Sequence, residues 1–164
     1  MCNYSCINGN TACNEYEPCE ERKYIVKKIN QKYRDNLLKD AEHNVPSIRC
    51  EDITSLYYSF LSGSRLCPYC GVEMKVRSEL VGYPDVISID HITSRSDGGD
   101  SRLSNLQMIC HRCNIVKQHQ APGHFSFLVR VMREEFGCEG LEDFLNKQFT
   151  TNFANKANQY RKRG

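Results

Sequence analysis

The N-terminal third of the chain carries apolar residues at helical intervals. Between Glu21 and Ala41 an apolar side chain recurs at every fourth position, and lysines or arginines occupy many of the others, which is the pattern of an amphipathic helix. Val45-Pro46-Ser47 ends the pattern, because the residue before a proline avoids helical backbone. A second helix is predicted from Glu51 to Leu61, ending near Ser62-Gly63.

Short β-like runs replace the helical pattern in the middle of the chain. Gly71–Val76 and Val86–Ile89 are separated by the turn-forming residues Gly82-Tyr83-Pro84-Asp85. Leu106–Ile109 is predicted to be a returning strand. Asn114–His119 is predicted to begin a helix that ends before the next proline.

The C-terminal part returns to helical spacing. One amphipathic helix is predicted near Phe125–Phe136 and ends at Gly137. Another is predicted over about Leu141–Phe149, and its continuation through Phe153 is left open. The apolar stripe of these helices is more typical of a core than of a binding surface.

Two Cys-x-x-Cys pairs frame the middle segment. They are Cys67-Pro68-Tyr69-Cys70 and Cys110-His111-Arg112-Cys113, and together they supply the four sulfurs that a structural zinc ion needs. Buried cysteines of an ordinary core are disfavoured, because Cys-Pro-Tyr-Cys-Gly is a turn sequence. A redox pair would need only one such motif in a thioredoxin-like context. The sequence therefore predicts structural zinc.

The segment between the two pairs resembles a known family. The residues that carry the resemblance are Cys67, Cys70, Asp90-His91-Ile92, Gly98-Gly99, Asn105-Leu106, Cys110, Cys113-Asn114 and Lys117. In this order and spacing, the chain from about Ile53 to Gln118 resembles the HNH endonucleases, whose active site is a ββα-metal (His-Me) finger. The resemblance implies that Asp90 is the first catalytic metal ligand, His91 the general base, Asn105 a brace for the histidine loop and Asn114 the second metal ligand.

These residue types suit phosphodiester hydrolysis, which requires a base for water and a cation for the phosphoryl charge. Neutral histidine is a suitable base near pH 7, since its ordinary pKa is about 6.5. The oxygen ligands of Asp90 and Asn114 suit Mg²⁺ or Mn²⁺ better than zinc. With only two protein ligands, such an ion would keep positions for water and phosphate.

Asp90 and His91 pose a geometric problem, because neighbouring residues on a regular strand point to opposite faces. We expect the strand Val86–Ile89 to end or twist at Asp90, and the loop Thr93–Asn105 to curl back over the site. Without the two flanking Cys-x-x-Cys pairs, an Asp-His dipeptide would be interpreted as a surface feature.

Arg95 and Lys117 flank the predicted site and are candidates for contacts with the DNA backbone. The alternative is that both are exposed cations without a special role, and the sequence favours neither reading.

The overall charge does not indicate a partner. The chain of 164 residues has 22 basic and 20 acidic side chains, a net charge of +2. Thr151–Gly164 carries four bases and no acid, so this tail is the candidate DNA-facing segment. The basic positions of the first helix indicate a solvated face rather than a DNA-contacting one. No apolar run or signal peptide is present, which predicts a soluble intracellular protein and no membrane partner.

Four more cysteines occur in the first 20 residues: Cys2, Cys6, Cys13 and Cys19. This leader is rich in turn-forming residues and has no periodic apolar pattern. A second zinc site is one interpretation, since metal can supply the folding free energy that a small core lacks. Free thiols in a leader are the other.

We therefore predict an α+β fold, in which a zinc-stapled ββα-metal (HNH) finger has flanking α-helices. The expected divisions are 1–22 (cysteine-rich leader), 23–50 (helix and linker), 51–122 (nuclease core) and 123–164 (helices and basic tail). The expected function is metal-dependent hydrolysis of DNA to 5′-phosphate and 3′-hydroxyl ends, by nicking or double-strand cleavage. The alternatives are an inactive zinc-finger module that binds nucleic acid and a zinc-stapled interaction protein. Recognition sequence, biological role and oligomeric state stay open, with a dimer as one route to double-strand cutting.

Overall fold

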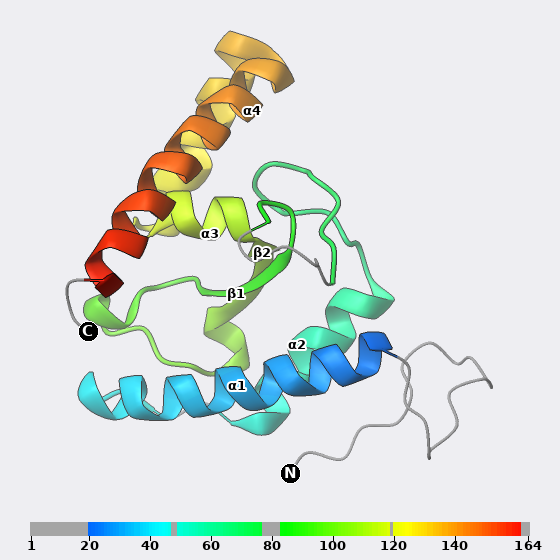
Figure 1. Cartoon of the computed structure of the whole chain (residues 1–164), viewed down its shortest axis with the longest axis vertical. Helices are drawn as coiled ribbons and strands as arrows, with labels where there is room; N and C mark the ends of the chain where they lie inside the picture. The colour runs from blue at the N-terminus through cyan, green and yellow to red at the C-terminus, as the bar shows by residue number, and fades with distance from the viewer. Residues whose placement is uncertain (1–19, 47–48, 77–82, 119, 162–164) are drawn as a thin grey trace. The chain divides into compact units, whose positions relative to one another are not determined.

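The computed structural model describes residues 20–46, 49–76, 83–118 and 120–161. The elements in chain order are α1 (Glu20–Glu42), α2 (Cys50–Ser62), β1 (Ile87–His91), the 3-10 helices η1 (Arg95–Asp97) and η2 (Leu103–Asn105), β2 (Leu106–Cys110), α3 (His111–Lys117) and α4 (Pro122–Arg161) (Figure 1). Helices together with one small antiparallel sheet make the fold α+β, which confirms the predicted class.

The chain divides into two compact units, each built from two stretches of sequence. The α1–α2 unit contains the residues up to Arg65 together with Asp90–Met108. The cysteine unit contains Leu66–Ile89 together with the residues from Ile109 onward. The predicted division into four consecutive segments stays a prediction.

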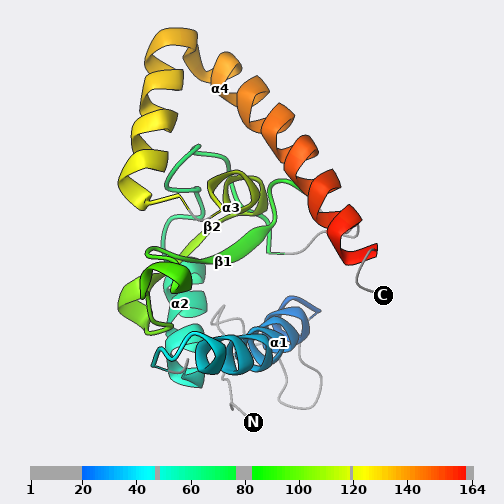
Figure 2. The same cartoon turned by 90° about the vertical axis from the view of Figure 1, so that its left-hand side faces the viewer.

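In the α1–α2 unit the two helices pack against each other, as both views show (Figures 1 and 2). α2 buries Ile53, Tyr57 and Phe60, whose spacing of four and three residues places them on one stripe of the helix. At its N-terminus the guanidinium of Arg49 donates two hydrogen bonds of 2.8 Å to Asp52. Both helices confirm the predicted ones, with ends that differ by one residue.

β1 runs further than predicted. It continues through Asp90 and His91, and the backbone N–H of Ile92 still donates to the carbonyl of Asn105 at 2.9 Å. An end of the strand at Asp90 is therefore wrong, because backbone pairing continues past it, whereas a twist at Asp90 stays a prediction. β2 confirms the predicted returning strand and extends it to Cys110.

In the cysteine unit, the second cysteine pair opens α3. Cys110 precedes the helix with extended backbone, and its sulfur accepts a hydrogen bond from the backbone N–H of Cys113 at 3.4 Å. This cap starts the helix at His111, three residues before the predicted start at Asn114. The predicted β-like run Gly71–Val76 forms two isolated β-bridges, at Glu73 and Lys75, and no continuous strand.

α4 consists of two helical arms (Figure 2), and its backbone departs from helical geometry at Gly137. The φ angle of Gly137 is 71°, in the region that favours glycine, so the helix turns there. The arms correspond to the two predicted helices, and the second extends to Arg161. Phe125, Leu141 and Leu145 are buried and form core, whereas Phe127, Phe136 and Phe153 are exposed, so the prediction of a core stripe is confirmed only in part.

Candidate functional site

The four framing cysteines meet in one cluster of the cysteine unit. Their sulfur atoms all lie within 4.8 Å of one another, and the Cys70 and Cys110 sulfurs are 3.6 Å apart. A tetrahedral zinc site with bonds of about 2.3 Å has sulfur–sulfur edges of about 3.8 Å. The cluster therefore has the donor type, number and spacing of a structural zinc site.

Local backbone geometry forms the first corner of this cluster. The N–H of Gly71 donates to the carbonyl of Cys67 at 2.9 Å, and the N–H of Cys67 donates to the carbonyl of Val72 at 2.8 Å. Gly71 has a φ of 76°, which a glycine adopts without strain. This tight turn brings the sulfurs of Cys67 and Cys70 to the same side.

Close sulfur contacts move the thiol pKa values apart. Hydrogen bonding from Cys110 lowers the pKa of Cys67 to about 7 and lowers that of Cys70 as well. The pKa of Cys113 is raised, chiefly because its hydrogen bond with Cys110 keeps the proton on its sulfur. Thiolates are the form that binds metal, so a cation in this cluster would favour loss of the thiol protons.

Arg112 is a buried cation beside the cluster that sequence reasoning missed. Its side chain is 7% exposed, and Nη2 lies 3.9 Å from the Cys70 sulfur. Nη1 donates to Asn146 at 2.7 Å and to Glu142 at 3.3 Å, so α4 holds the guanidinium in place. Four thiolates around Zn²⁺ carry a net charge of −2, which a neighbouring cation stabilises. In the sequence, the only sign that Arg112 lies beside the cluster is its position between Cys110 and Cys113.

Polar side chains from distant parts of the chain surround His91 in the α1–α2 unit. His91 Nε2 lies 2.9 Å from the hydroxyl oxygen of Ser101, and this hydroxyl donates to Asp40 Oδ1 at 2.7 Å. Arg95 donates to Asp40 at 2.5 Å and to Asn36. We call these five residues the Ser101 network. Asn36, Asp40 and Ser101 were not predicted, since no local spacing relates them to His91.

Asn105 closes the loop that follows β1. Its amide oxygen accepts from the N–H of Thr93 at 2.8 Å, and its amide nitrogen donates to the carbonyls of Thr93 and Asp100 at 3.0 and 2.7 Å. Gly99 lies against the same carbonyl of Thr93, and a Cβ there would be 2.0 Å from that oxygen. The loop geometry is that of a brace, and its part in catalysis stays a prediction.

The two predicted ligands of the catalytic ion lie in different units. Asp90 is 6% exposed and accepts from Gln107 Nε2 at 2.8 Å. Asn114 donates through Nδ2 to the hydroxyl of Ser88 at 2.5 Å and toward the carbonyl of Ile89 at 3.5 Å. Each side chain is held by its own neighbours. That they share one cation stays a prediction.

Neither predicted DNA-contacting cation is an exposed side chain. Lys117 is 1% exposed, and the side chain of Arg95 is 14% exposed and paired with Asp40. The reading of both as exposed cations is wrong, because α3 buries Lys117 in its last turn and Arg95 pairs with Asp40 on α1. Contact of either residue with DNA stays a prediction. The leader cysteines Cys2, Cys6, Cys13 and Cys19 lie outside the described residues, as does the end of the basic tail.

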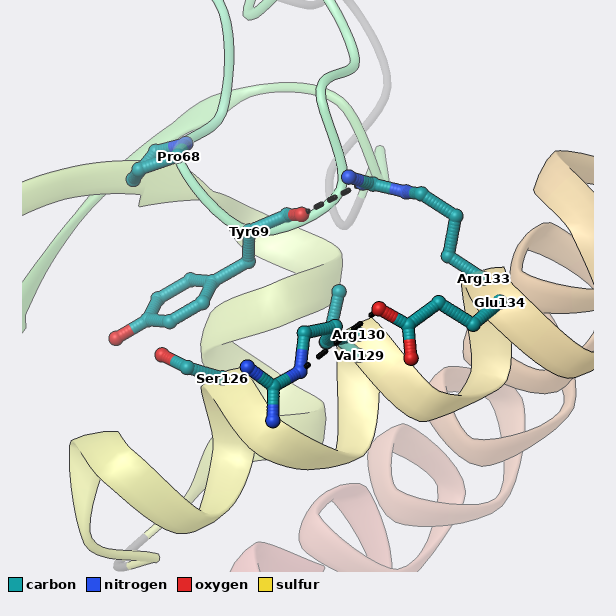
Figure 3. A pocket seen from close by; sticks show the side chains of 7 residues that line it. All are labelled: Pro68, Tyr69, Ser126, Val129, Arg130, Arg133 and Glu134. Atoms are coloured by element: carbon teal, nitrogen blue, oxygen red, sulfur yellow. Dashed lines mark hydrogen bonds and ion pairs between the residues drawn. The ribbon is translucent and has the colours of Figure 1, made fainter.

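A pocket of about 310 Å³ lies beside the first cysteine pair, between that turn and the first arm of α4 (Figure 3). It is lined by Pro68, Tyr69, Ser126, Val129, Arg130, Arg133 and Glu134. Arg133 donates to the carbonyl of Tyr69 at 2.9 Å, and Arg130 pairs with Glu134 at 4.0 Å, as the dashed lines in Figure 3 show. Both guanidinium groups thus have partners within the protein.

Comparisons with known proteins identify one segment. Residues 67–120 match a family model described as HNH endonuclease, and this segment runs from the first zinc-site cysteine past the end of α3. None of the curated proteins or solved structures searched matches the chain. Among the described residues, no helix is both long enough and apolar enough to cross a bilayer.

Proposed function

We propose that the protein hydrolyses phosphodiester bonds of DNA with a divalent cation, because residues 67–120 match a family model described as HNH endonuclease. The observation that carries the proposal is the loop after β1. There Asn105 makes three hydrogen bonds that close the loop containing Ser101, and Ser101 in turn contacts His91. A histidine held in this way can accept a proton from water without having to reorganise.

The remaining groups account for the other needs of the reaction. Hard oxygen donors are available on Asp90 and Asn114, and these suit Mg²⁺ or Mn²⁺. When bound, such an ion supplies charge neutralisation at the phosphoryl and leaving oxygens. Gln107 orients the carboxylate of Asp90, and the hydrogen bond from Asn114 Nδ2 to Ser88 turns the amide oxygen away as the remaining donor atom.

Asn114 on α3 also contacts the backbone of β1. Asn114 Nδ2 lies 3.5 Å from the carbonyl of Ile89, the residue bonded directly to Asp90. Of the two proposed ligands, Asp90 lies on β1 and Asn114 on α3. The four cysteines would hold structural zinc at the start of the same helix.

In the proposed reaction, His91 takes a proton from water as that water attacks phosphorus, and the 3′ oxygen departs. The products are 5′-phosphate and 3′-hydroxyl ends, as in the family that the domain represents. One finger cuts one strand, so a monomer is expected to nick.

Conversion of supercoiled plasmid to the nicked form tests the proposal. The zinc-loaded protein should nick DNA with Mg²⁺, EDTA should stop the reaction, and His91→Ala should abolish most of it. A protein that retards DNA in a gel but never nicks it, with Mg²⁺ or Mn²⁺ in excess, would instead be an inactive nucleic-acid-binding module. Loss of both binding and cleavage would leave only an interaction protein.

A further inference from the structure

The hydroxyl of Ser101 is the meeting point of three polar side chains. It lies 2.7 Å from Asp40 Oδ1, 2.9 Å from His91 Nε2 and 3.1 Å from Arg95 Nη2. Ser101 itself is 0% exposed, as is Asp40. Solvent is therefore excluded from the hydroxyl, and the direction of each hydrogen bond is decided by these three partners.

Counting protons gives each bond a direction. Asp40 is paired with the guanidinium of Arg95 at 2.5 Å, so it is an ionised carboxylate that only accepts. The single hydroxyl proton of Ser101 then goes to Asp40. The hydroxyl oxygen has two lone pairs left, and Arg95, which can only donate, uses one of them. His91 Nε2 must use the other, and it can do so only as an N–H donor.

From this count we propose that Asp40 on α1 is a positioning residue, which acts through Ser101 to keep the neutral His91 ring protonated on Nε2. Nδ1 is then the nitrogen with a lone pair, and it is the atom that accepts the proton of water. This role in catalysis rests on the proposed nuclease function, whereas the position of the ring proton does not.

The position of Asp40 on α1 suits this role. Asn36 and Asp40 are four positions apart, which places them one above the other on the same helix face, and both are buried. Arg95 donates to both of them, so the buried carboxylate has its charge compensated and its rotamer held. α1 lies outside residues 67–120, the segment that matches the family model.

The ring nitrogens of His91 can be observed directly. In ¹⁵N–¹H spectra of the zinc-loaded protein at about pH 8.5, well above the ordinary histidine pKa of about 6.5, Nε2 should be pyrrole-like and Nδ1 pyridine-like. The Nε2 proton should give a signal protected from exchange with water. The His91 signals are identified by their absence in His91→Gln. A proton on Nδ1 in the wild-type protein would overturn the proposal without any variant.

Two variants break the network, and each has a matched control. Ser101→Ala removes the acceptor of the Nε2 proton, and Asp40→Asn removes the charge that orients the hydroxyl. Ser104→Ala and Asp35→Asn make the same chemical changes at exposed positions in the same loop and on the same helix. In both network variants the Nε2 proton should exchange rapidly with water, and in both controls it should stay protected.

Kinetics separate positioning from simple stability. Both network variants should lower kcat for nicking by about 10–100-fold with little change in KM, as supporting partners of catalytic groups typically do. If folding and zinc content are normal but kcat and the Nε2 signal match those of the controls, Asp40 has no positioning role. If Asp40→Asn does not fold, Ser101→Ala and the wild-type spectrum decide. A wild-type protein that never nicks DNA would end the nuclease proposal, while the spectra would still test the proton position.

Discussion

The cysteine cluster and the Ser101 network are both buried polar clusters, but they are completed in different ways. In the cluster, four sulfur atoms lie within 4.8 Å of one another, and hydrogen bonds between them push the thiol pKa values in opposite directions. In the network, every contact of the Ser101 hydroxyl joins a donor to an acceptor. The first cluster has the donor atoms to hold an ion from outside the protein, whereas the second is satisfied by the protein's own side chains.

The two clusters therefore draw their stability from different sources: metal binding in the cysteine cluster and the packing of α1 in the Ser101 network. Metal binding to the cysteines is folding free energy for the cysteine unit, since such a site does not exist in an unfolded chain. The Ser101 network depends instead on the packing of α1, which carries Asn36 and Asp40. Perturbing one should therefore leave the other largely in place.

The largest effect should come from removing zinc. Chelation, or Cys113→Ser, should unfold much of the cysteine unit, since structural zinc contributes about 10–16 kcal/mol in small zinc-dependent folds. Hydrogen exchange should show lost protection in α3 with retained protection in α1. Cys138→Ser is the control, because Cys138 is exposed and outside the cluster. Equal loss of protection in both helices would show that the two clusters are not independent.

Loss of the base should come next. His91→Ala is expected to reduce plasmid nicking by about 10²–10⁴-fold, the usual contribution of a positioned acid–base group. Zinc content and the unfolding midpoint should stay near the wild-type values. His124→Ala provides the comparison, since His124 is an exposed histidine on α4. Wild-type cleavage by the His91 variant would refute the assignment of the base.

The catalytic ion should respond to different residues than zinc does. Asn114→Ala and Asp90→Ala are each expected to lower nicking by about 10–100-fold and to raise the Mg²⁺ concentration needed for half-maximal activity. Metal analysis should still give the wild-type zinc content. Zinc loss in Asp90→Ala would mean that the two metal sites are not separate, and in Asn114→Ala it would also reflect the neighbouring Cys113.

A smaller effect is expected from crowding the loop that Asn105 closes. Gly99→Ala would place a Cβ 2.0 Å from the Thr93 carbonyl oxygen and 2.8 Å from Asn105 Nδ2, so the loop backbone must shift. We expect a loss of about 1–3 kcal/mol in the free energy of unfolding, measured with urea. At Gly123, a Cβ would meet nothing within 4 Å, so Gly123→Ala should not destabilise the protein.

The smallest effect expected is the loss of the Arg49–Asp52 contribution to stability at acidic pH. Hydrogen bonding from Arg49 lowers the pKa of Asp52 below its ordinary value of 3.8. A lowered pKa in the folded state stabilises the protein above the unfolded value, and that contribution disappears as the pH falls through the folded pKa. Asp52→Asn should therefore lower the urea midpoint near neutral pH but not at strongly acidic pH. An equal decrease at both pH values would show that the ion pair is not the cause.

Much of the secondary structure could be predicted because its signals are local. The spacing of apolar residues defined α1 and α2 to within one residue, and Gly137 marked the turn in α4. The two cysteine pairs predicted their own cluster, since a Cys-x-x-Cys turn brings its two sulfurs together by itself. The match of residues 67–120 to the HNH endonucleases confirms the family that the same residues indicated.

Contacts between distant residues were decided only by the tertiary structure. Asp40 and Ser101 are 61 positions apart, and nothing in the spacing around either residue relates them. Lys117 and Arg95 were expected at the surface because charged side chains usually lie there, yet packing buries one and pairs the other with Asp40. Local patterns determine which residues can bind zinc or form a helix. The surroundings of His91 depend on how α1 packs, because a side chain's partners are chosen by proximity in the folded chain.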